Sequence, residues 1–165
     1  MGSLCGSSKK RYSQLPGTRI FCVYKNKKYY LASHKYYDKD KLDEDSVLLI
    51  AHDNWLDHGM NFDIQYYKNG INISYKDDVY KMKDWKLYVT KNKGEYVPVF
   101  HKYKSSYFKK EKYDDYTFLL KETTTNLYLA IDTENLRDDN KYGSSYYVGL
   151  CSDRTGASRW VSFDK

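Results

Sequence analysis

The feature of this sequence that most restricts its fold is a series of short runs of β-branched and aromatic residues, separated from one another by polar turns. The chain has 165 residues, of which 20 are tyrosine and only 2 are proline. Tyrosine favours strands and tolerates half-burial, because its ring is apolar and its tip is polar. Such runs predict strands and an all-β fold. We predict about twelve strands, at residues 19–24, 28–32, 47–51, 62–67, 71–75, 79–82, 86–90, 96–100, 116–121, 127–131, 146–150 and 159–163.

Turn-forming residues stand between these runs. Asn or Gly, which adopt positive φ without strain, is present at residues 25–27, 68–70, 92–94 and 154–156. Hairpins are therefore the expected connections. No long Gly-, Ser- or Pro-rich linker interrupts the chain, so we expect a single domain over residues 18–165, preceded by a flexible tail at residues 1–17.

A weak repeat divides the predicted strands into three units. Each unit opens with a short aromatic and aliphatic motif and closes with an aromatic one. The openings are Tyr30-Leu31-Ala32, Leu87-Tyr88-Val89 and Leu127-Tyr128-Leu129-Ala130. The closings are Phe62-Asp63-Ile64, Tyr116-Thr117-Phe118 and Trp160-Val161-Ser162-Phe163.

Three four-strand units of this kind resemble the β-trefoil, and most closely the interleukin-one and fibroblast growth factor superfamily. The segments that carry the resemblance are residues 17–24 with 29–31, 79–82 with 87–89, and 145–150 with 156 and 160–163. The resemblance implies a β-trefoil of about twelve strands in three pseudo-repeats, and a protein partner such as a receptor. Fascins and hisactophilins, which share the Tyr-Leu-Ala opening, are similar to the chain more distantly and imply a cytoskeletal partner.

Two functional motifs of trefoil families are missing from the sequence. The segment that corresponds to the heparin-binding part of the growth factors, residues 151–156, carries one arginine and one aspartate. Heparin binding is therefore not implied by the resemblance. The Gln-x-Trp triplets of ricin-type lectins do not occur in the sequence, which weakens a sugar-binding interpretation.

The chain is basic, with a net charge of +6 from 28 Lys and Arg residues against 22 Asp and Glu residues. Most of the cations are lysines, whereas bidentate recognition of bases and phosphates relies on arginine. We therefore do not expect sequence-specific nucleic-acid binding. Either solubility or an anionic partner, such as a lipid headgroup or a glycan, explains the charge.

The densest basic segment, residues 101–113, interleaves lysines with aromatic rings. This combination is typical of proteins that follow a single-stranded nucleic-acid backbone or hold a phosphorylated headgroup. The alternative is a strand and loop of a tyrosine-rich protein whose lysines face solvent. The residues of the candidate anion or ligand patch are Lys102, Lys104, Tyr107, Lys109, Lys110 and Lys112.

The first residues resemble a dual lipid anchor. Gly2 is placed for a myristoyl chain, Cys5 for a palmitoyl chain, and the basic residues 9–11 for anionic headgroups. The preferred Ser or Thr at the sixth position is absent. The alternatives are a flexible tail without lipid and an artificial leader at residues 1–3.

The three cysteines, Cys5, Cys22 and Cys151, favour a reducing compartment, because an odd and small number does not form a disulfide framework. Cys22 and Cys151 are expected in core strands. The sequence has no apolar run of signal-peptide or membrane-spanning length. We therefore expect a cytoplasmic protein, membrane-associated if the tail is lipidated, with leaderless export left open.

The sequence contains no nucleophile elbow, phosphate loop, paired-cysteine zinc pattern or dinucleotide fingerprint. His52, Asp53, Asp57 and His58 lie close together but match no known spacing of metal ligands. We therefore expect no enzyme activity, no cofactor and no metal.

The leading functional expectation is a non-catalytic module that binds a protein through its loops, because binding residues tend to lie on loops of a rigid scaffold. The candidate loops are residues 33–46 and 132–145. The first alternative is a trefoil that binds a carbohydrate, a phosphoinositide or another polyanion, lipid-anchored at a membrane. The second is a protease inhibitor.

Overall fold

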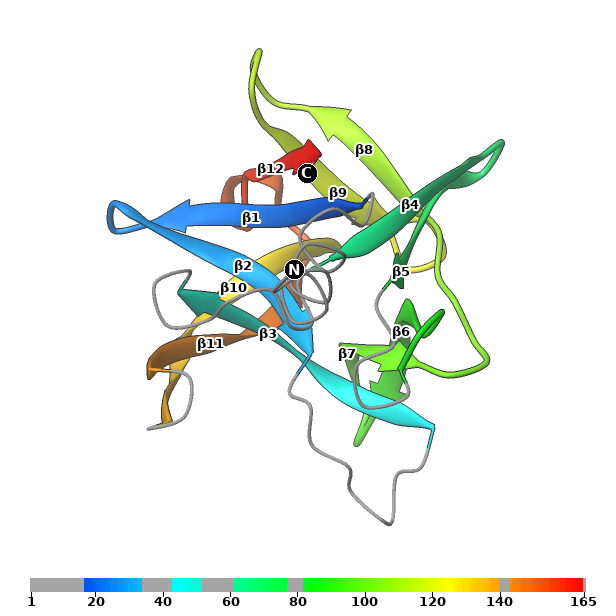
Figure 1. Ribbon diagram of the computed structural model, residues 1–165, viewed down its shortest axis with the longest axis horizontal. Helices are drawn as coiled ribbons and strands as arrows, with labels where there is room; N and C mark the ends of the chain where they lie inside the picture. The colour runs from blue at the N-terminus through cyan, green and yellow to red at the C-terminus, as the bar shows by residue number, and fades with distance from the viewer. Residues whose placement is uncertain (1–16, 34–42, 52–60, 77–81, 140–142, 165) are drawn as a thin grey trace, which may run out of the picture.

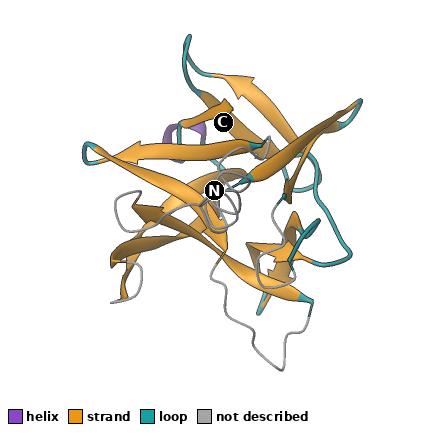
Figure 2. Ribbon diagram, in the orientation of Figure 1, coloured by secondary structure: helices purple, strands orange, loops and turns teal. Residues whose placement is uncertain are grey.

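The computed structural model describes residues 17–33, 43–51, 61–76, 82–139 and 143–164, and this part of the chain is built from strands (Figures 1 and 2). The all-β prediction is confirmed. One 3-10 turn, η3 (Arg154–Gly156), accompanies the strands within the described residues. The strands are β1 (Thr18–Tyr24), β2 (Lys27–Ser33), β3 (Glu44–Ala51), β4 (Phe62–Tyr67), β5 (Gly70–Tyr75), β6 (Lys86–Asn92), β7 (Glu95–His101), β8 (Phe108–Lys112), β9 (Phe118–Glu122), β10 (Tyr128–Asp139), β11 (Gly143–Cys151) and β12 (Trp160–Asp164).

Every described strand except β8 overlaps a predicted run. The pattern does not predict β8 because four of its five residues are charged. Its strand conformation comes from pairing with β9 over residues 108–112. A predicted strand at residues 79–82 is not seen: residues 79–81 lie outside the described residues, and Met82 is described but is not in a strand.

Six strands pair in a closed cycle. β1 pairs with β4, β4 with β5, β5 with β8, β8 with β9, β9 with β12, and β12 with β1. Each of the six therefore has a neighbour on both sides, which stabilises a sheet by satisfying the backbone groups of both edges.

The other six strands form the hairpins β2–β3, β6–β7 and β10–β11. In Figure 1, β3 runs from β6 and β7 at one end to β10 and β11 at the other. It pairs with β7 through residues 44–46 and with β11 through residues 48–50. The three hairpins are thus joined to one another through β3.

The two loops predicted to make contacts differ from the observed structure. The prediction of a loop at residues 132–145 is wrong, because residues 132–139 continue β10 and residues 143–145 begin β11. Polar residues there obscured the strand, and the pairing is irregular between Ile131 and Leu136. In the loop expected at residues 33–46, both ends belong to strands, and residues 34–42 lie outside the described residues.

The core contains one fully buried aromatic residue at the start of each of β4, β8 and β12. These residues are Phe62, Phe108 and Trp160, each 0% exposed. Phe62 stacks on Phe100 with a centroid separation of 5.7 Å, and the Tyr75 ring meets Phe100 edge-on at 5.0 Å. Burial of each such side chain contributes about 1.5–3 kcal/mol.

The strand register differs from the alignment predicted for the three opening motifs. Buried leucines hold equivalent places in the first strand of each hairpin: Leu31, Leu87 and Leu129. Tyrosine precedes the buried leucine at Leu31 and at Leu129. At Leu87 the preceding residue is Lys86, and the tyrosine, Tyr88, follows the leucine. Phe108 begins β8, whereas the predicted closing residue Phe118 begins β9.

Candidate functional site

The candidate site lies where the three hairpins meet. β7 and β11 both leave β3 near Val47, since the partner of β3 changes there. No ladder joins β7 to β11 within the described residues. Two strand edges therefore stay open in that part of the chain: residues 95–98 of β7 on the side away from β6, and residues 148–151 of β11 on the side away from β10.

Pro98 explains why the ladder between β3 and β7 ends where it does. The last pair is Ser46 with Val99, and Pro98 is the next residue along β7. Proline has no backbone N–H to donate. Val89, the β6 partner of Pro98, donates its backbone N–H to Ser106 Oγ at 2.9 Å. The two residues therefore form a non-hydrogen-bonded pair, and the missing donor of Pro98 belongs to the edge of β7 that points away from β6.

A cleft of about 710 Å³ occupies the space between the two edges. Residues 90–92 and 95–99 form one wall, and residues 130–132 and 147–151 form the other. β3 contributes Glu44, Ser46 and Val47. A volume of this size is typical of a ligand-binding cleft.

The cleft is acidic although the chain as a whole carries a charge of +6. Three carboxylates line it, from Glu44, Glu95 and Asp132, whereas Lys91 is the one lysine among its lining residues. The Lys91 Nζ atom lies 5.4 Å from the centroid of the Tyr96 ring, a distance at which the ring face attracts the cation. The local charge is therefore opposite in sign to the net charge of the chain.

An irregularity in β10 holds Asp132 at the wall. Asp132 Oδ1 accepts a hydrogen bond from the Glu134 backbone N–H at 3.2 Å, and Oδ2 accepts one from Asn135 Nδ2 at 2.6 Å. Both donors are neutral, so they orient the carboxylate without cancelling its charge. They lie where the register shifts between Ile131 and Leu136, and irregularities of this kind commonly re-aim a side chain.

Small residues make the same wall shallow. Ala130 pairs with Gly149 across the β10–β11 hairpin. A Cβ atom at Gly149 would lie 3.8 Å from Asp132 Cβ, an ordinary van der Waals contact. A larger side chain at Gly149 would therefore occupy the cleft without forcing the backbone to move.

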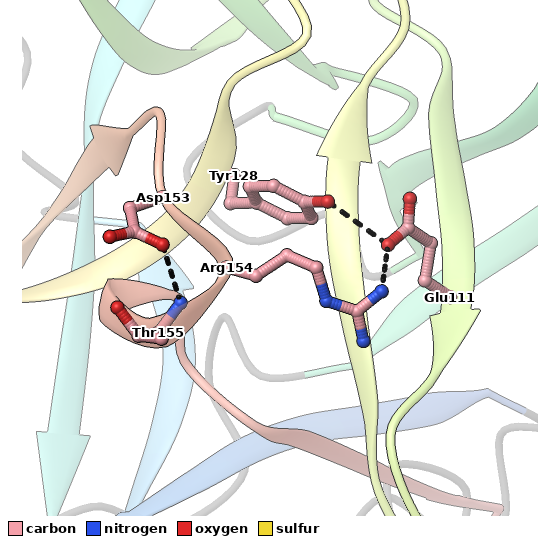
Figure 3. Close-up of polar contacts among 5 residues, drawn as sticks. All are labelled: Glu111, Tyr128, Asp153, Arg154 and Thr155. Atoms are coloured by element: carbon pink, nitrogen blue, oxygen red, sulfur yellow. Dashed lines mark hydrogen bonds and ion pairs between the residues drawn. The ribbon is translucent and has the colours of Figure 1, made fainter.

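The end of this wall is fixed by contacts of η3 (Figure 3). Arg154 Nη1 lies 3.1 Å from Glu111 Oε1, which also accepts a hydrogen bond from the Tyr128 hydroxyl at 3.0 Å. Burial raises the pKa of Tyr128, and the hydrogen bond to Glu111 acts in the same direction. η3 is thereby tied to β8 and β10, which places Gly156 at the cleft.

Two cysteines are described, and both are held as thiols. Burial raises the pKa of Cys22 to about 12, and its expected place in the core is confirmed. Cys151 lines the cleft and is half-buried, so it is more exposed than expected. Burial also raises the pKa of Cys151, whose Sγ donates to the carbonyl oxygen of Asp153 at 3.4 Å.

The predicted anion patch is spread over a loop and both faces of β8. Lys102 and Lys104 lie in the loop that follows β7, and the Lys104 Nζ atom is 5.8 Å from the centroid of the Tyr88 ring. Tyr107 precedes β8 and packs edge-on against Tyr67 at 5.6 Å. These residues are therefore held by local aromatic contacts.

The patch lysines on β8 point in two directions. Successive side chains of a strand alternate between its faces, so Lys110 and Lys112 share one face, on which Lys110 Nζ lies 4.4 Å from the centroid of Phe118. Lys109 lies on the other face, directly opposite Lys121 of β9. The structure thus gathers the lysines into pairs and does not form one continuous patch of all six residues.

His101 organises the loop that carries Lys102 and Lys104. Its Nδ1 atom accepts hydrogen bonds from the backbone N–H groups of Tyr103 and Lys104, both at 3.0 Å. Burial lowers the pKa of His101, and Lys104 acts in the same direction against the opposing effect of Glu44. The neutral ring therefore carries its proton on Nε2.

The remaining candidate residues, Gly2, Cys5 and the histidines and carboxylates of residues 52–58, lie outside the described residues. In the part of the chain that the structure describes, no group of three or more His, Cys, Asp or Glu side chains is placed to hold a metal ion. No helix in that part is long and apolar enough to cross a membrane.

The sequence interpretation missed the cleft, although two residues signal it. Pro98 lies inside the predicted strand at residues 96–100, and a proline in a strand marks an open edge. Gly149 lies inside the predicted strand at residues 146–150, where a glycine marks a close approach of a ligand or of another backbone. Neither signal says which two strands are left unpaired.

Comparison with known proteins bears on the fold alone. No protein-family model matches the chain, and the search of curated proteins found no match. Among solved structures, the chain is similar to a "Salivary protein from Culex quiquefasciatus that belongs to the Cysteine and Tryptophan-Rich (CWRC) family". The TM-score is 0.54 at 14% sequence identity, over 88% of this chain and 92% of that chain.

Proposed function

We propose that the chain is a β-trefoil. The closed cycle of six strands and the three hairpins outside it support this assignment, since a trefoil has six barrel strands and three capping hairpins. The units β1–β4, β5–β8 and β9–β12 each contain four strands. The equivalent aromatic residues Phe62, Phe108 and Trp160 are buried at the start of the fourth strand of each unit.

The function that the geometry supports best is non-catalytic binding of a protein partner at the hairpin end of the domain. The observation that carries this proposal is the cleft between β7 and β11, where two strand edges end without a ladder in the described residues. Open strand edges recognise extended segments of other proteins through backbone hydrogen bonds. Tyr96, which is 44% exposed at the wall, is of the residue type enriched at protein interfaces.

The cysteine of the cleft supports binding over nucleophilic chemistry. A reactive cysteine needs its thiolate form. Burial raises the pKa of Cys151 and keeps its sulfur protonated at neutral pH. The proposal therefore assigns Cys151 to the wall of the binding cleft and gives it no covalent role.

A second candidate function, binding of a polyanion at β8 and β9, is favoured by the cross-strand pair of Lys109 and Lys121. Like charges directly opposite each other destabilise a pair of strands, and an anion between them relieves the repulsion. Lipidation at Gly2 and Cys5, which stays a prediction, would bring this surface close to anionic headgroups.

Site-specific photo-crosslinking tests the two candidates. The amino acid p-benzoylphenylalanine replaces Tyr96 in one version of the full chain and Tyr116 in another. Tyr116, which is 84% exposed in the β8–β9 turn, gives a matched control on the other surface. We expect a discrete protein adduct from position 96 in an extract of the native source, and none of that mass from position 116.

The crosslinking outcome separates the candidates. A protein adduct confined to position 116 would contradict the cleft as the binding site. Absence of a protein adduct at either position, with retention on heparin or phosphoinositide beads that Lys109→Glu abolishes, would favour the polyanion function.

A further inference from the structure

We propose that the cleft between β7 and β11 binds an extended, basic segment of the protein partner, and that this segment adds as a strand to the edge of β11. The inference rests on the proposed function and specifies the conformation and charge of the bound segment. An open strand edge, an excess of carboxylates and a shallow wall of small residues carry it.

Residues 148–151 of β11 supply the strand edge. β10 pairs with β11 along one side, and β3 pairs with the other side at residues 145–147. Beyond that point no described strand forms a ladder with this side of β11, and β7 forms the facing wall of the cleft. Because Pro98 removes a donor from the facing edge of β7, the segment hydrogen-bonds to β11 and meets β7 through side chains.

The carboxylates lie on both sides of the path that such a segment takes. Glu95 belongs to the end of the β6–β7 hairpin, Asp132 belongs to β10, and Glu44 belongs to β3. Side chains of an extended segment alternate in direction, so basic residues on either face of the segment approach a carboxylate. The chain as a whole carries a net charge of +6, so the surface outside the cleft repels a basic ligand and leaves the cleft as the favoured place for it.

An aromatic wall adds to the recognition of cations. The Lys91 ammonium already lies 5.4 Å from the centre of the Tyr96 ring, which shows that the ring face accepts a cation in this geometry. Arginine stacks on such rings more readily than lysine, because its guanidinium is planar and weakly hydrated. We therefore expect arginine to be preferred over lysine in the segment.

Labelled synthetic peptides test the charge preference. Three peptides of equal length alternate Val or Thr with Arg, with Gln or with Glu, and each carries fluorescein for anisotropy with the full chain. We expect the Arg peptide to bind at least about tenfold more tightly than the Gln peptide, which corresponds to about 1.4 kcal/mol. The Glu peptide should show no binding.

Cleft variants locate the site. Glu95→Gln should weaken the Arg peptide by about threefold, because one carboxylate is removed from a partly exposed site. Gly149→Leu should abolish binding by filling the cleft. Asp115→Asn, which removes the same charge in the β8–β9 turn, is the matched control and should leave the affinity unchanged. Thermal unfolding of each variant verifies that it is folded.

An N-methyl series tests the strand geometry. Methylation of alternate backbone nitrogens of the Arg peptide removes the donors on one edge, whereas methylation of the other set leaves that edge intact. One of the two peptides should lose binding and the other should keep it, because a strand uses one edge to pair with β11. Equal affinities for the two peptides would overturn strand addition.

The outcomes distinguish this inference from the proposed function. Equal affinity for the Arg, Gln and Glu peptides, or Arg-peptide binding that Gly149→Leu leaves intact, would overturn the basic-segment inference. A protein adduct at position 96 together with that result would leave the protein-binding function standing. If position 96 gives no protein adduct but the Arg peptide binds tightly and in a charge-dependent way, the peptide-binding cleft stands. That result would instead count against the proposed physiological partner.

Discussion

The cleft between β7 and β11 and the surface of β8 and β9 both gather charge on strands, but they gather opposite charges on different backbone arrangements. At the cleft, carboxylates surround strand edges that have no ladder within the described residues. On β8 and β9, lysines lie along a continuous ladder. A continuous ladder has no backbone groups left to offer along the paired edge, so a ligand of the proposed lysine surface would be recognised by charge alone. The proposed binding at the cleft would combine charge with backbone hydrogen bonds, and salt screens charge more effectively than it weakens those bonds.

Among the substitutions that test this comparison, Phe108→Ala should have the largest effect on the free energy of unfolding. Phe108 begins β8, is 0% exposed and pairs with Ile71 and Glu122. Loss of its ring should reduce the free energy of unfolding by about 3–5 kcal/mol, because a cavity remains in the core. Urea unfolding measures the change. The exposed Tyr116→Ala is the control, and a loss below 1 kcal/mol for Phe108→Ala would contradict the assigned core position.

Glu122→Ala tests the turn that connects the lysine surface to the cleft wall. Glu122 is 2% exposed at the end of β9. Its carboxylate accepts hydrogen bonds from the backbone N–H groups of Thr124 and Thr125, at 2.6 and 2.9 Å. Removing an acceptor from such charge-assisted bonds should destabilise the protein by about 2–3 kcal/mol.

Urea unfolding measures the effect of Glu122→Ala, and Glu122→Gln is its isosteric control. The glutamine keeps one acceptor oxygen, so it should lose less stability than the alanine. Equal losses for the two variants would show that packing, and not the hydrogen bonds of the carboxylate, holds the turn between β9 and β10.

Comparison of the predicted strands with the observed ones shows which features of the fold follow from the sequence. The sequence predicts a closing aromatic residue at Phe118 and does not predict a strand at Phe108, because the charged residues of β8 hide the strand pattern. The strand count and class follow from periodic runs. The cleft does not follow from them, because it arises where two hairpins fail to pair, and that depends on the register of β3 with both. Pro98 and Gly149 mark the two edges without indicating that they face each other.

Acid should loosen the loop beside the cleft before it affects other parts of the described chain. Burial lowers the pKa of His101 below its ordinary value of 6.5. A lowered folded-state pKa means that the stabilising effect is complete above pH 6.5 and is lost as the pH falls through the folded-state value. Protonation of Nδ1 removes the acceptor for Tyr103 and Lys104. The pKa values of Asp114 and Asp153 are lowered from an ordinary value of 3.8. Protonation of these two carboxylates therefore affects stability at a lower pH than protonation of His101 does.

Thermal unfolding between pH 7.5 and 5 measures this effect. The melting temperature should fall in the wild type and fall less in His101→Gln, whose side chain does not titrate in this range. Parallel curves for the two proteins would show that His101 does not couple the loop to pH. Amide hydrogen exchange at residues 103 and 104 should accelerate over the same interval.

The smallest expected effects come from two ion pairs, one between the regions and one within the lysine surface. Arg154 and Glu111 join η3 to β8, with side chains 53% and 25% exposed. Lys112 and Asp115 pair at 3.5 Å with side chains 75% and 85% exposed. Double-mutant cycles should give a coupling of about 1 kcal/mol for the first pair and about 0–0.3 kcal/mol for the second, because exposed pairs are screened.

The comparison of the two coupling energies decides whether the wall of the cleft depends on the lysine surface of β8 and β9. Arg154→Gln should also weaken the Arg peptide slightly, since η3 holds Gly156 at the cleft through the Glu111 contact, whereas Lys112→Gln should leave peptide binding unchanged. Equal couplings for the two pairs, with no effect of Arg154→Gln on the peptide, would mean that the cleft is held by β3, β7 and β11 alone. The lysine surface and the cleft would then be energetically independent, and each could change without altering the other.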